Sequence, residues 1–426
     1  MIGRRLVLII ILVAGPAPAH AQQPLTLADA QAEARARAPE VGALEAIVRG
    51  AEAIAAQASR MFRQDPTVSG SYFNGALIGR SEENSWTLGA QLPVDVSGSW
   101  RTRSASATAD VKRTEFDREN GLRALDEQVA VAVADVALQQ RLIERDQRLL
   151  NLYAIAADGA HQQLNVGQGA QLDADSADLD LGGARILLEQ VRGDLARART
   201  RLARLLGRGS GVDLVVADLP EPAPTLQRPD LDALVERDPR VRAALAEIDA
   251  ATFERETFAR LVRPMPTFGL SSGYNRSEIP TGSFSGTPFA GTLRANWPDR
   301  DLVFNVSLPI PLFDRQVEPR ARATGRLLTA EARARTARAD VRTELESAWA
   351  AFDAATRALQ AVADTPTLID RDAGFVEQAV RAGAFDAVTR SLALRRLDDA
   401  GRRVDTAVRD LRAARAAWLR RILLSP

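Results

Sequence analysis

The sequence contains no cysteine and only two histidines, His20 and His161. The absence of thiols excludes disulfides, thiolate metal ligands and a lipid anchor on cysteine. Little acid–base or metal chemistry near neutral pH is left, because His20 lies in the leader described below. The net charge is zero, which gives no indication of a nucleic-acid partner. No nucleophile–base pair or metal-ligand cluster occurs, so we expect no enzyme, no metal site and no cofactor.

The sequence also lacks an apolar run long enough for a transmembrane helix, which needs about 18 residues or more. Its longest apolar run, LVLIIILVAG, follows the basic start MIGRR and precedes the small-x-small stretch Ala19-His20-Ala21. This order is typical of a secretory signal peptide over residues 1–21. We predict export and a mature chain that begins at Gln22; a short N-terminal anchor is the alternative.

Two halves of the chain repeat each other. Residues 38–72 align with residues 238–272 at an offset of 200 without a gap, and later positions align at an offset of 216. The change of offset arises in one place, between the second and third matched prolines, which suggests a loop at one end of the structure. Chance similarity between two Ala/Arg-rich segments is the alternative. The matched positions include Pro39/Pro239, Pro66/Pro266, Pro93/Pro309 and Gly167/Gly383.

The repeat predicts a first half at residues 22–207, a proline-rich linker at 208–229 and a second half at 230–426. Each half is predicted to contain a helix, two strands, a long helix, a turn and a last helix. The uninterrupted helical pattern after Pro93 predicts a helix on the order of 80 Å, which needs neighbours along its whole length. Pro366 is expected to break its counterpart. The predicted helices are 26–62, 104–158, 171–206, 230–262, 318–363 and 386–424, and the predicted strands are 67–74, 86–95, 267–275 and 302–311.

All four predicted strands alternate between apolar and polar residues. In LVFNVSLPIPLF, Phe304 and Val306 point one way, whereas Asn305 and Ser307 point the other way. Eight to ten residues cross a bilayer at a tilt, and this alternation is typical of an outer-membrane barrel. An ordinary sheet packed on the helices, with its polar face in water, is the alternative. Four aromatic residues lie near strand ends or outer loops, where interfacial aromatics are expected: Tyr72, Trp86, Tyr274 and Trp297.

Four strands are too few to close a barrel, because the smallest bacterial barrels have about eight. Several chains must therefore contribute strands; two copies would give eight, and three would give twelve with room for an aqueous lumen. The prolines in QLPV and LPIPLF fit strand ends, where the chain turns into helix.

Three stretches resemble TolC-like outer-membrane efflux channels: PLTLADAQAEARARAPEV, LVFNVSLPIPLFDRQVEPRARA and VRAGAFDAVTRSLALRRLDDA. The resemblance covers essentially the whole mature chain. Within the family, LPIPLFDRQ with VGQGAQLDADSADLDL is most similar to the CzcC-like heavy-metal cation branch.

The resemblance implies a fold class that is mainly α with a transmembrane β portion. Long antiparallel helical hairpins would form a periplasmic α-barrel, and four strands per chain would contribute to a trimeric twelve-stranded β-barrel in the outer membrane of a Gram-negative bacterium. It also implies docking to a periplasmic adaptor and an inner-membrane pump of the resistance-nodulation-division type. Many relatives carry a lipid-anchored cysteine just after the leader; this chain has none, so we expect it not to be lipidated.

Two turns between helices are the candidate contact sites for the adaptor, because in the family such turns meet the adaptor's helical hairpin. Small residues allow close approach of a partner helix, and glycine adopts the left-handed conformation that the turn requires. A plain turn without a partner is the alternative. The predicted tips are Val166, Gly167 and Gly169 in the first half and Ala382, Gly383 and Ala384 in the second.

Asp173 and Asp386 follow the two turns. Repeated around a three-fold axis, they would form an acidic ring that attracts cations. A helix N-cap or a solvated helix face is the alternative. His161 near the first tip fits a surface residue better than a metal ligand.

The leading hypothesis is an outer-membrane duct that exports small solutes, with heavy-metal cations as the expected cargo. A drug-efflux or type I secretion duct remains open, since nothing in the sequence identifies the cargo. A periplasmic coiled-coil adaptor that forms no channel is the alternative from another class, and the matched alternating strands argue against it.

Overall fold

The computed structural model describes residues 24–61, 65–77, 81–209, 214–217, 230–283, 292–309, 316–382 and 387–422. The predicted signal peptide and most of the predicted linker lie outside the described residues. The chain divides into two compact units, and each is built from segments that are distant in the sequence. Unit 1 comprises residues 1–41, 123–228 and 348–423, and unit 2 comprises residues 42–122, 229–347 and 424–426.

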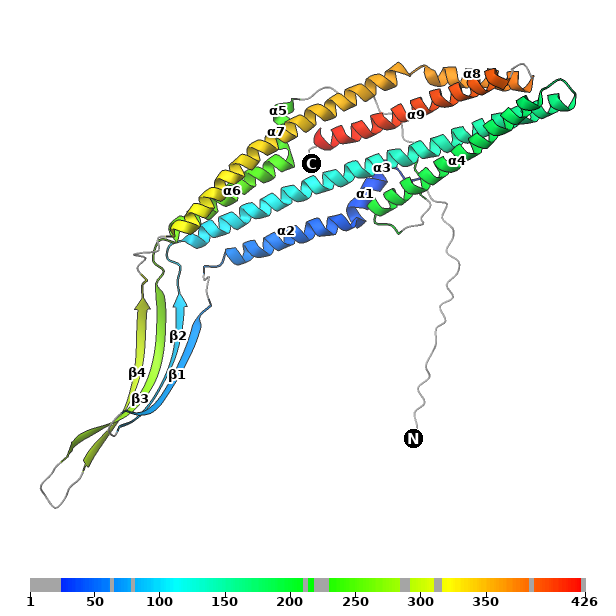
Figure 1. The fold of residues 1–426 in the computed structure, drawn as a ribbon. Helices are drawn as coiled ribbons and strands as arrows, with labels where there is room; N and C mark the ends of the chain where they lie inside the picture. The colour runs from blue at the N-terminus through cyan, green and yellow to red at the C-terminus, as the bar shows by residue number, and fades with distance from the viewer. Residues whose placement is uncertain are drawn as a thin grey trace, which may run out of the picture. The chain divides into compact units, whose positions relative to one another are not determined.

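Unit 2 contains a four-stranded antiparallel sheet in the order β1-β2-β3-β4, joined to helices (Figure 1). The matched halves of the chain contribute one hairpin each, and β2 and β3 pair where the halves meet. The strands are β1 (Thr67–Leu77), β2 (Ser81–Pro93), β3 (Thr267–Ser283) and β4 (Thr292–Ser307). The helices of this unit are α5 (Leu231–Arg237), most of α2 (Pro39–Ala58), α6 (Pro239–Arg260) and the first parts of α3 (Ser99–Asn165) and α7 (Val317–Ala361).

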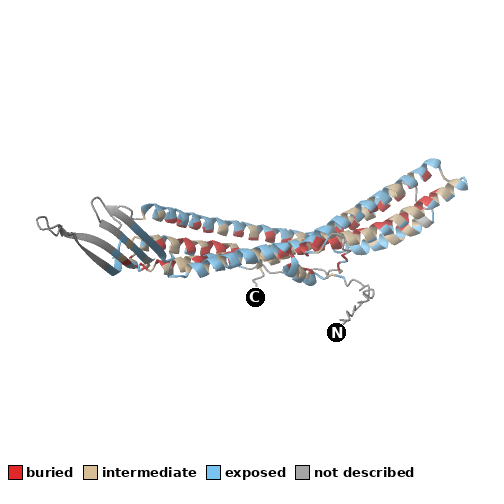
Figure 2. Cartoon of the chain, turned by 90° about the horizontal axis from the view of Figure 1, so that it is seen from below, coloured by how far each residue is buried: buried red, intermediate tan, exposed pale blue. Residues whose placement is uncertain are grey.

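Unit 1 consists of helices packed along their lengths. It contains the second part of α3, the end of α7, and four further elements: α1 (Leu27–Arg37), α4 (Gln171–Leu205), α8 (Thr365–Arg381) and α9 (Ala387–Ile422). Buried residues lie on the sides of the helices that face one another, whereas the outer sides are exposed (Figure 2). One core cluster joins α1, α3 and α4 through residues such as Ala34, Val133 and Leu202.

The prediction of one continuous helix over residues 26–62, and of another over 230–262, was wrong. Each segment contains two helices, because the residue before the matched proline is extended: Ala38 has ψ 133° and Asp238 has ψ 132°. The proline ring clashes with an α-helical residue before it, but proline is well placed at the first position of the next helix. The break expected near Pro366 is confirmed, since α7 ends at Ala361 and α8 begins at Thr365.

Four strands were predicted and four are present, but all four extend further from the helices than expected, and β1 continues to Leu77. β2 begins at Ser81, β3 continues to Ser283 and β4 begins at Thr292. These extensions carry polar stretches such as SEENS, in which no alternation of apolar residues indicates a strand. Backbone pairing with the neighbouring strand maintains them. No described helix is long and apolar enough to cross a membrane.

Candidate functional site

The sheet has one apolar face and one polar face, and its apolar face is open. Leu302 is 73% exposed and Phe304 is 66% exposed. Neighbouring strands keep the same alternation, because Leu270 pairs with Phe304, and Phe268 stacks on Phe304 with ring centroids 6.3 Å apart. A continuous surface of large exposed apolar side chains indicates contact with a protein partner or with the apolar interior of a membrane. This face also carries Val68, Leu88 and Val306.

Three of the predicted interfacial aromatics form one row across the sheet. Tyr72 pairs with Trp86, and Trp86 pairs with Tyr274 on the next strand. Arg300 continues the row on β4. Amphipathic rings at one level on the apolar face are the arrangement expected at the boundary between a bilayer and water. Trp297 pairs with Ser277 further along the hairpin, outside this row.

The opposite face carries mostly small polar side chains, among them Ser71, Thr87 and Ser271, with Phe73 and Val303 as exposed apolar exceptions. Two glycines on β3 leave room for longer side chains from β4. A Cβ on Gly269 would collide with the Asn305 amide oxygen, and a Cβ on Gly273 would collide with the Asp301 carboxylate. The polar side chains of β4 therefore lie flat across the sheet, which keeps this face shallow.

A buried polar cluster joins β2 to α3. The carboxylate of Asp95 accepts hydrogen bonds from the backbone N–H of Ser97 (2.9 Å), from the Ser97 hydroxyl (2.6 Å) and from the Ser99 hydroxyl (2.5 Å). Burial alone would raise the pKa of Asp95, but these donors hold it below its ordinary value. Gly98 has φ +69°, and its carbonyl accepts from Arg260. Sequence reasoning missed this cluster, although DVSGS contains the Asp and Ser residues typical of turns and helix caps.

The first predicted tip is a helix-ending glycine turn. Gly167 has φ +73°; its N–H bonds the Leu164 carbonyl at 3.0 Å, and the Gln168 N–H bonds the Gln163 carbonyl at 2.9 Å. These two bonds define a Schellman motif, for which glycine is preferred. A Cβ on Gly167 would meet nothing within 4 Å. Neighbouring Val166 is 68% exposed, so this tip is open for contact.

The second tip lies mostly outside the described residues. Ala382 is described and exposed, whereas Gly383, Ala384 and Asp386 are not described. Asp173 is the third residue of α4 and is exposed; the N-cap position is Ala170, so Asp173 does not cap the helix. An exposed carboxylate in the first turn is favoured by the helix dipole. Near this tip, His161 Nε2 lies 3.0 Å from Asp178, and both side chains are about half exposed.

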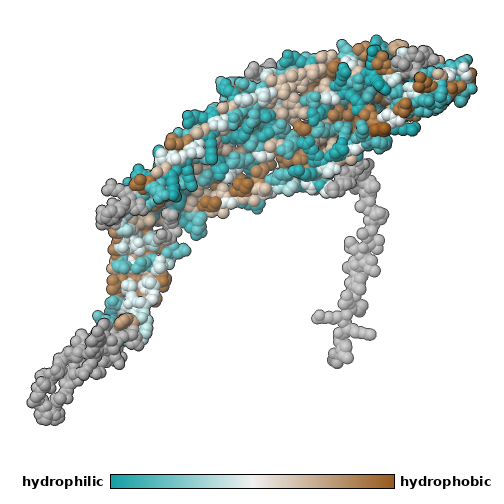
Figure 3. Space-filling model, viewed as in Figure 1, coloured by the Kyte–Doolittle hydropathy of each residue, from teal (hydrophilic) through white to brown (hydrophobic). Residues whose placement is uncertain are grey.

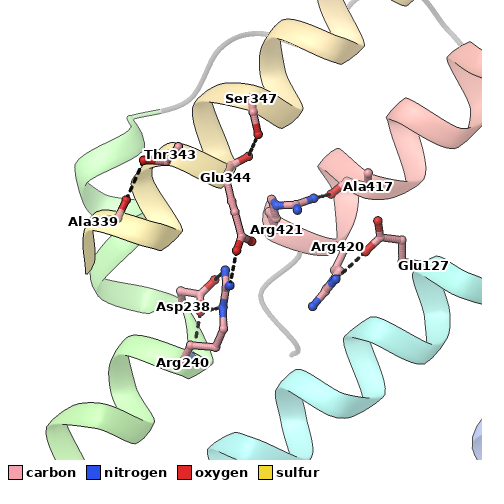
Figure 4. A network of polar contacts seen from close by, with 10 residues as sticks. All are labelled: Glu127, Asp238, Arg240, Ala339, Thr343, Glu344, Ser347, Ala417, Arg420 and Arg421. Carbon is pink, nitrogen blue, oxygen red and sulfur yellow. Dashed lines mark hydrogen bonds and ion pairs between the residues drawn. The ribbon is translucent and has the colours of Figure 1, made fainter. Parts of the chain in front are cut away.

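Arginine–carboxylate pairs connect α3 with α9 along unit 1. Arg402 contacts both oxygens of Asp146 at 2.7 and 2.8 Å, and Arg409 bonds Asp135 at 2.8 Å. Figure 4 shows a third pair, in which Arg420 bonds Glu127 at 2.6 Å. Burial raises the pKa of Asp146 despite its pairing with Arg402. Sequence reasoning missed this pairing, since partners so distant in the chain carry no local signal. Unit 2 has a separate pair, in which Arg240 bonds Asp238 and Glu344.

Tyr153 lies beside these pairs in a hollow between α3, α4 and α9. Burial, reinforced by Asp180 and Asp398, raises its pKa to about 12. It therefore stays a neutral hydroxyl throughout the physiological range. Among the described residues, no group of three or more His, Asp or Glu side chains is arranged to hold a metal ion.

The structure thus combines a sheet with one lipid-compatible face, a polar opposite face and long helical hairpins, which is the construction of a membrane duct. Residues 30–208 and 231–423 match the family described as Outer membrane efflux protein. The chain belongs to this family, whose members are channels in the outer membrane and not enzymes.

Solved structures show the same fold. The outer-membrane channel OprN has 22% identity and a TM-score of 0.72, with 93% of this chain and 89% of that chain covered. The open state of the Neisseria gonorrhoeae MtrE outer membrane channel has 17% identity and a TM-score of 0.71, with 93% and 88% covered. CusC has 17% identity and a TM-score of 0.66, with 92% and 91% covered. No curated protein sequence matches the chain.

Proposed function

We propose that three copies of this chain form the outer-membrane duct of a tripartite efflux system that exports heavy-metal cations. Each copy would contribute four strands to a twelve-stranded wall, with the apolar face toward lipid and the polar face toward the lumen. A periplasmic adaptor and an inner-membrane pump of the resistance-nodulation-division type would complete the system.

The observation that carries the proposal is the two-faced sheet. Its apolar face ends in the row formed by Tyr72, Trp86 and Tyr274. From this row to Leu92 the strand rises by about 20 Å. Because barrel strands tilt by about 35–45°, this length covers about 15 Å of the apolar band of outer-membrane proteins, which is about 25 Å tall. The same strands carry mostly small polar side chains on the other face, which suits a water-filled lumen.

The open tip at Gly167 is the proposed contact with the adaptor, together with Val166, Gly169 and the second tip at Ala382, Gly383 and Ala384. The left-handed Gly167 ends α3, and the exposed Val166 offers an apolar surface beside it. Three copies of Asp173, with Asp386 from the second tip, would surround the entrance with carboxylates and attract cations.

The cation cargo follows from the similarity of the tip and strand motifs to the CzcC-like branch. Because no metal-holding group occurs among the described residues, we assign the choice of cargo to the pump and the passage to this chain. The acidic entrance would favour cations over anions without binding any one of them tightly.

Deletion of the gene followed by growth tests on zinc, cobalt, cadmium, copper and common drugs tests the proposed cargo. Greater sensitivity to metals alone supports it, and greater sensitivity to drugs alone identifies a drug duct instead.

Gly167→Trp tests the tip: efflux should be lost while the oligomer remains in the outer membrane. Gly167→Asn keeps the left-handed conformation with a small side chain, and Gly193→Trp places the same bulk elsewhere on the hairpin. Survival of efflux in Gly167→Trp would refute the tip assignment.

A further inference from the structure

Each junction between a helix and a strand of unit 2 carries an exposed arginine. Arg60 follows the end of α2, Arg101 is the third residue of α3, Arg263 follows the end of α6, and Arg320 is the fourth residue of α7. Within the described ranges, no carboxylate pairs with any of these four side chains, which we call the basic collar. Further along α7 the arginines do bond carboxylates of α5 or α6, as Arg326, Arg333, Arg338 and Arg342 show. The charge of the collar is therefore available to a partner.

Exposed apolar side chains lie between the basic collar and the strands along the chain. Met61 follows the end of α2, Val96 precedes α3, Leu308 follows β4 and Val317 begins α7. Val96 and Val317 are 59% and 69% exposed. These residues extend the exposed apolar surface beyond the sheet, toward the helices. On the side drawn in Figure 3, apolar patches on the sheet give way to hydrophilic surface where the helices begin.

The height of the apolar face indicates that one boundary of the membrane falls at these junctions. The face covers about 15 Å between the aromatic row and Leu92, whereas the apolar band is about 25 Å tall. Beyond the aromatic row the strands are polar, as in SEENS of β2 and at Asp299 and Asp301 of β4. The remaining part of the band, about 10 Å, must therefore lie on the helix side of Leu92. Aromatic residues then mark one boundary of the bilayer and arginines mark the other.

Two half-buried arginines hold the junctions together. Arg260, which the repeat matches to Arg60, bonds the carbonyl of Gly98 at 3.3 Å. Arg103 bonds the carbonyls of Ala58 and Arg60 at 3.1 and 2.7 Å. The ends of α2 and α6 are thus fixed to the start of α3, while the Arg60 side chain itself stays exposed.

Another collar arginine is held by an aromatic ring. Arg101 lies over Trp100, with 5.2 Å between its guanidinium carbon and the ring centre. A guanidinium stacked in this way keeps the N–H donors at its edge for a second partner. Tryptophan is also a typical residue of the interface between a bilayer and water.

We propose that the basic collar binds the phosphate groups of anionic phospholipids in the periplasmic leaflet of the outer membrane. The helices of channels in this family extend into the periplasm, so the junctions lie at that leaflet. Guanidinium groups bind phosphate through paired hydrogen bonds, and anionic lipids attract basic residues near the membrane surface. The neighbouring apolar side chains would contact the acyl chains of the same lipids. The collar is independent of the cargo, so this inference can fail while the proposed function stands.

Native mass spectrometry of the detergent-solubilised oligomer tests the collar, with phosphatidylglycerol or phosphatidylcholine of the same acyl chains as the added lipid. The unmodified protein should retain phosphatidylglycerol at least tenfold more strongly. Arg60→Gln/Arg320→Gln should weaken this binding about fivefold for each arginine removed and leave phosphatidylcholine unaffected. Arg49→Gln/Arg335→Gln is the matched control, because it removes two exposed arginines from the same helices roughly 16 and 22 Å away. The control should bind both lipids as the unmodified protein does.

Three further measurements separate charge, folding and the source of the phosphate. Arg60→Lys/Arg320→Lys keeps the charge and should keep most of the binding. Equal losses in the test and control pairs would refute the proposal, as would equal retention of the two lipids. Should the glutamine variant fail to assemble, the unmodified protein decides: a preference for phosphatidylglycerol that high salt abolishes supports the collar, and no preference refutes it. Displacement of the lipid by inorganic phosphate at matched ionic strength would identify a free anion as the ligand and overturn the lipid assignment.

Discussion

Helices α2 and α6 occupy matched positions in the two halves of unit 2 and differ in what covers them. Both begin at a matched proline, Pro39 or Pro239. α6 buries residues along most of its length, among them Ala243, Ala246 and Ala250, whereas α2 has no buried residue. The duplicated sequence pattern therefore determines that each segment is helical, but it does not determine which residues pack against the helix.

The matched side chains show how the two helices have diverged. On α6, Glu247 bonds Arg333 at 2.6 Å. The matched residue of α2 is Ile47, which is 58% exposed. The same difference recurs one heptad later, where Glu254 bonds Arg326 and Ile54 is 67% exposed. The surface positions of α6 form ion pairs with α7 of the same chain, whereas the matched positions of α2 are exposed isoleucines.

The largest effect is expected from enlarging one matched small residue in each helix. Ala250→Leu should destabilise the protein by about 2–3 kcal/mol, because Ala250 is only 6% exposed and a larger side chain overpacks the contact with α3. Gly50→Leu, at the matched position of α2, should be neutral or stabilising by up to about 1 kcal/mol, since leucine favours a helix more than glycine does. Chemical unfolding of the detergent-solubilised protein measures both, and equal losses would contradict the difference in burial.

A second comparison concerns two left-handed glycines at helix ends of unit 1. A Cβ on Gly207 would collide with the Arg37 backbone at 2.5 and 2.9 Å, whereas one on Gly167 would meet open space. Both residues have positive φ. We expect Gly207→Ala to cost about 2–3 kcal/mol and Gly167→Ala about 1 kcal/mol, the strain of the left-handed conformation alone. Unfolding midpoints of the two variants measure the difference; a costlier Gly167→Ala would show that the tip is packed.

The buried polar cluster around Asp95, which joins β2 to α3, gives a prediction that depends on pH. Because the pKa of Asp95 is below its ordinary value in the folded protein, its carboxylate adds stability above about pH 4 that is lost as pH falls through the folded pKa. Asp95→Asn should cost about 1–2 kcal/mol at pH 7 and progressively less below pH 4. Thermal unfolding at pH 7 and pH 3 checks this, and a loss that does not depend on pH would show that packing, not charge, matters here.

The smallest effect is expected for the ion pairs that distinguish α6 from α2. Glu254→Gln should cost about 0.2–1 kcal/mol, because Arg326 is 69% exposed and water screens the pair. The loss should shrink further in high salt. Unfolding in low and high salt measures it, and a cost well above this range would show that this surface is covered in the assembly.

The sequence predicted the strand count, the long helices and the turn at Gly167, because alternation, unbroken helical period and turn glycines are local signals. It did not predict the breaks before Pro39 and Pro239, since apolar positions continue across both. Two further features were missed for different reasons: the polar strand ends beyond Trp86 depend on pairing with a neighbour, and the pairing of Arg402 with Asp146 depends on chain segments brought together only by folding.

Adjacent residues of β4 provide the most direct test that one face of the sheet meets lipid and the other meets water. The chain has no cysteine of its own, so the single variants Phe304→Cys and Asn305→Cys can each be treated with a membrane-impermeant maleimide in intact outer membranes. The account predicts rapid labelling at position 305 and protection at position 304, with the protection removed when detergent replaces the bilayer. Equal labelling of both positions in intact membranes would contradict it.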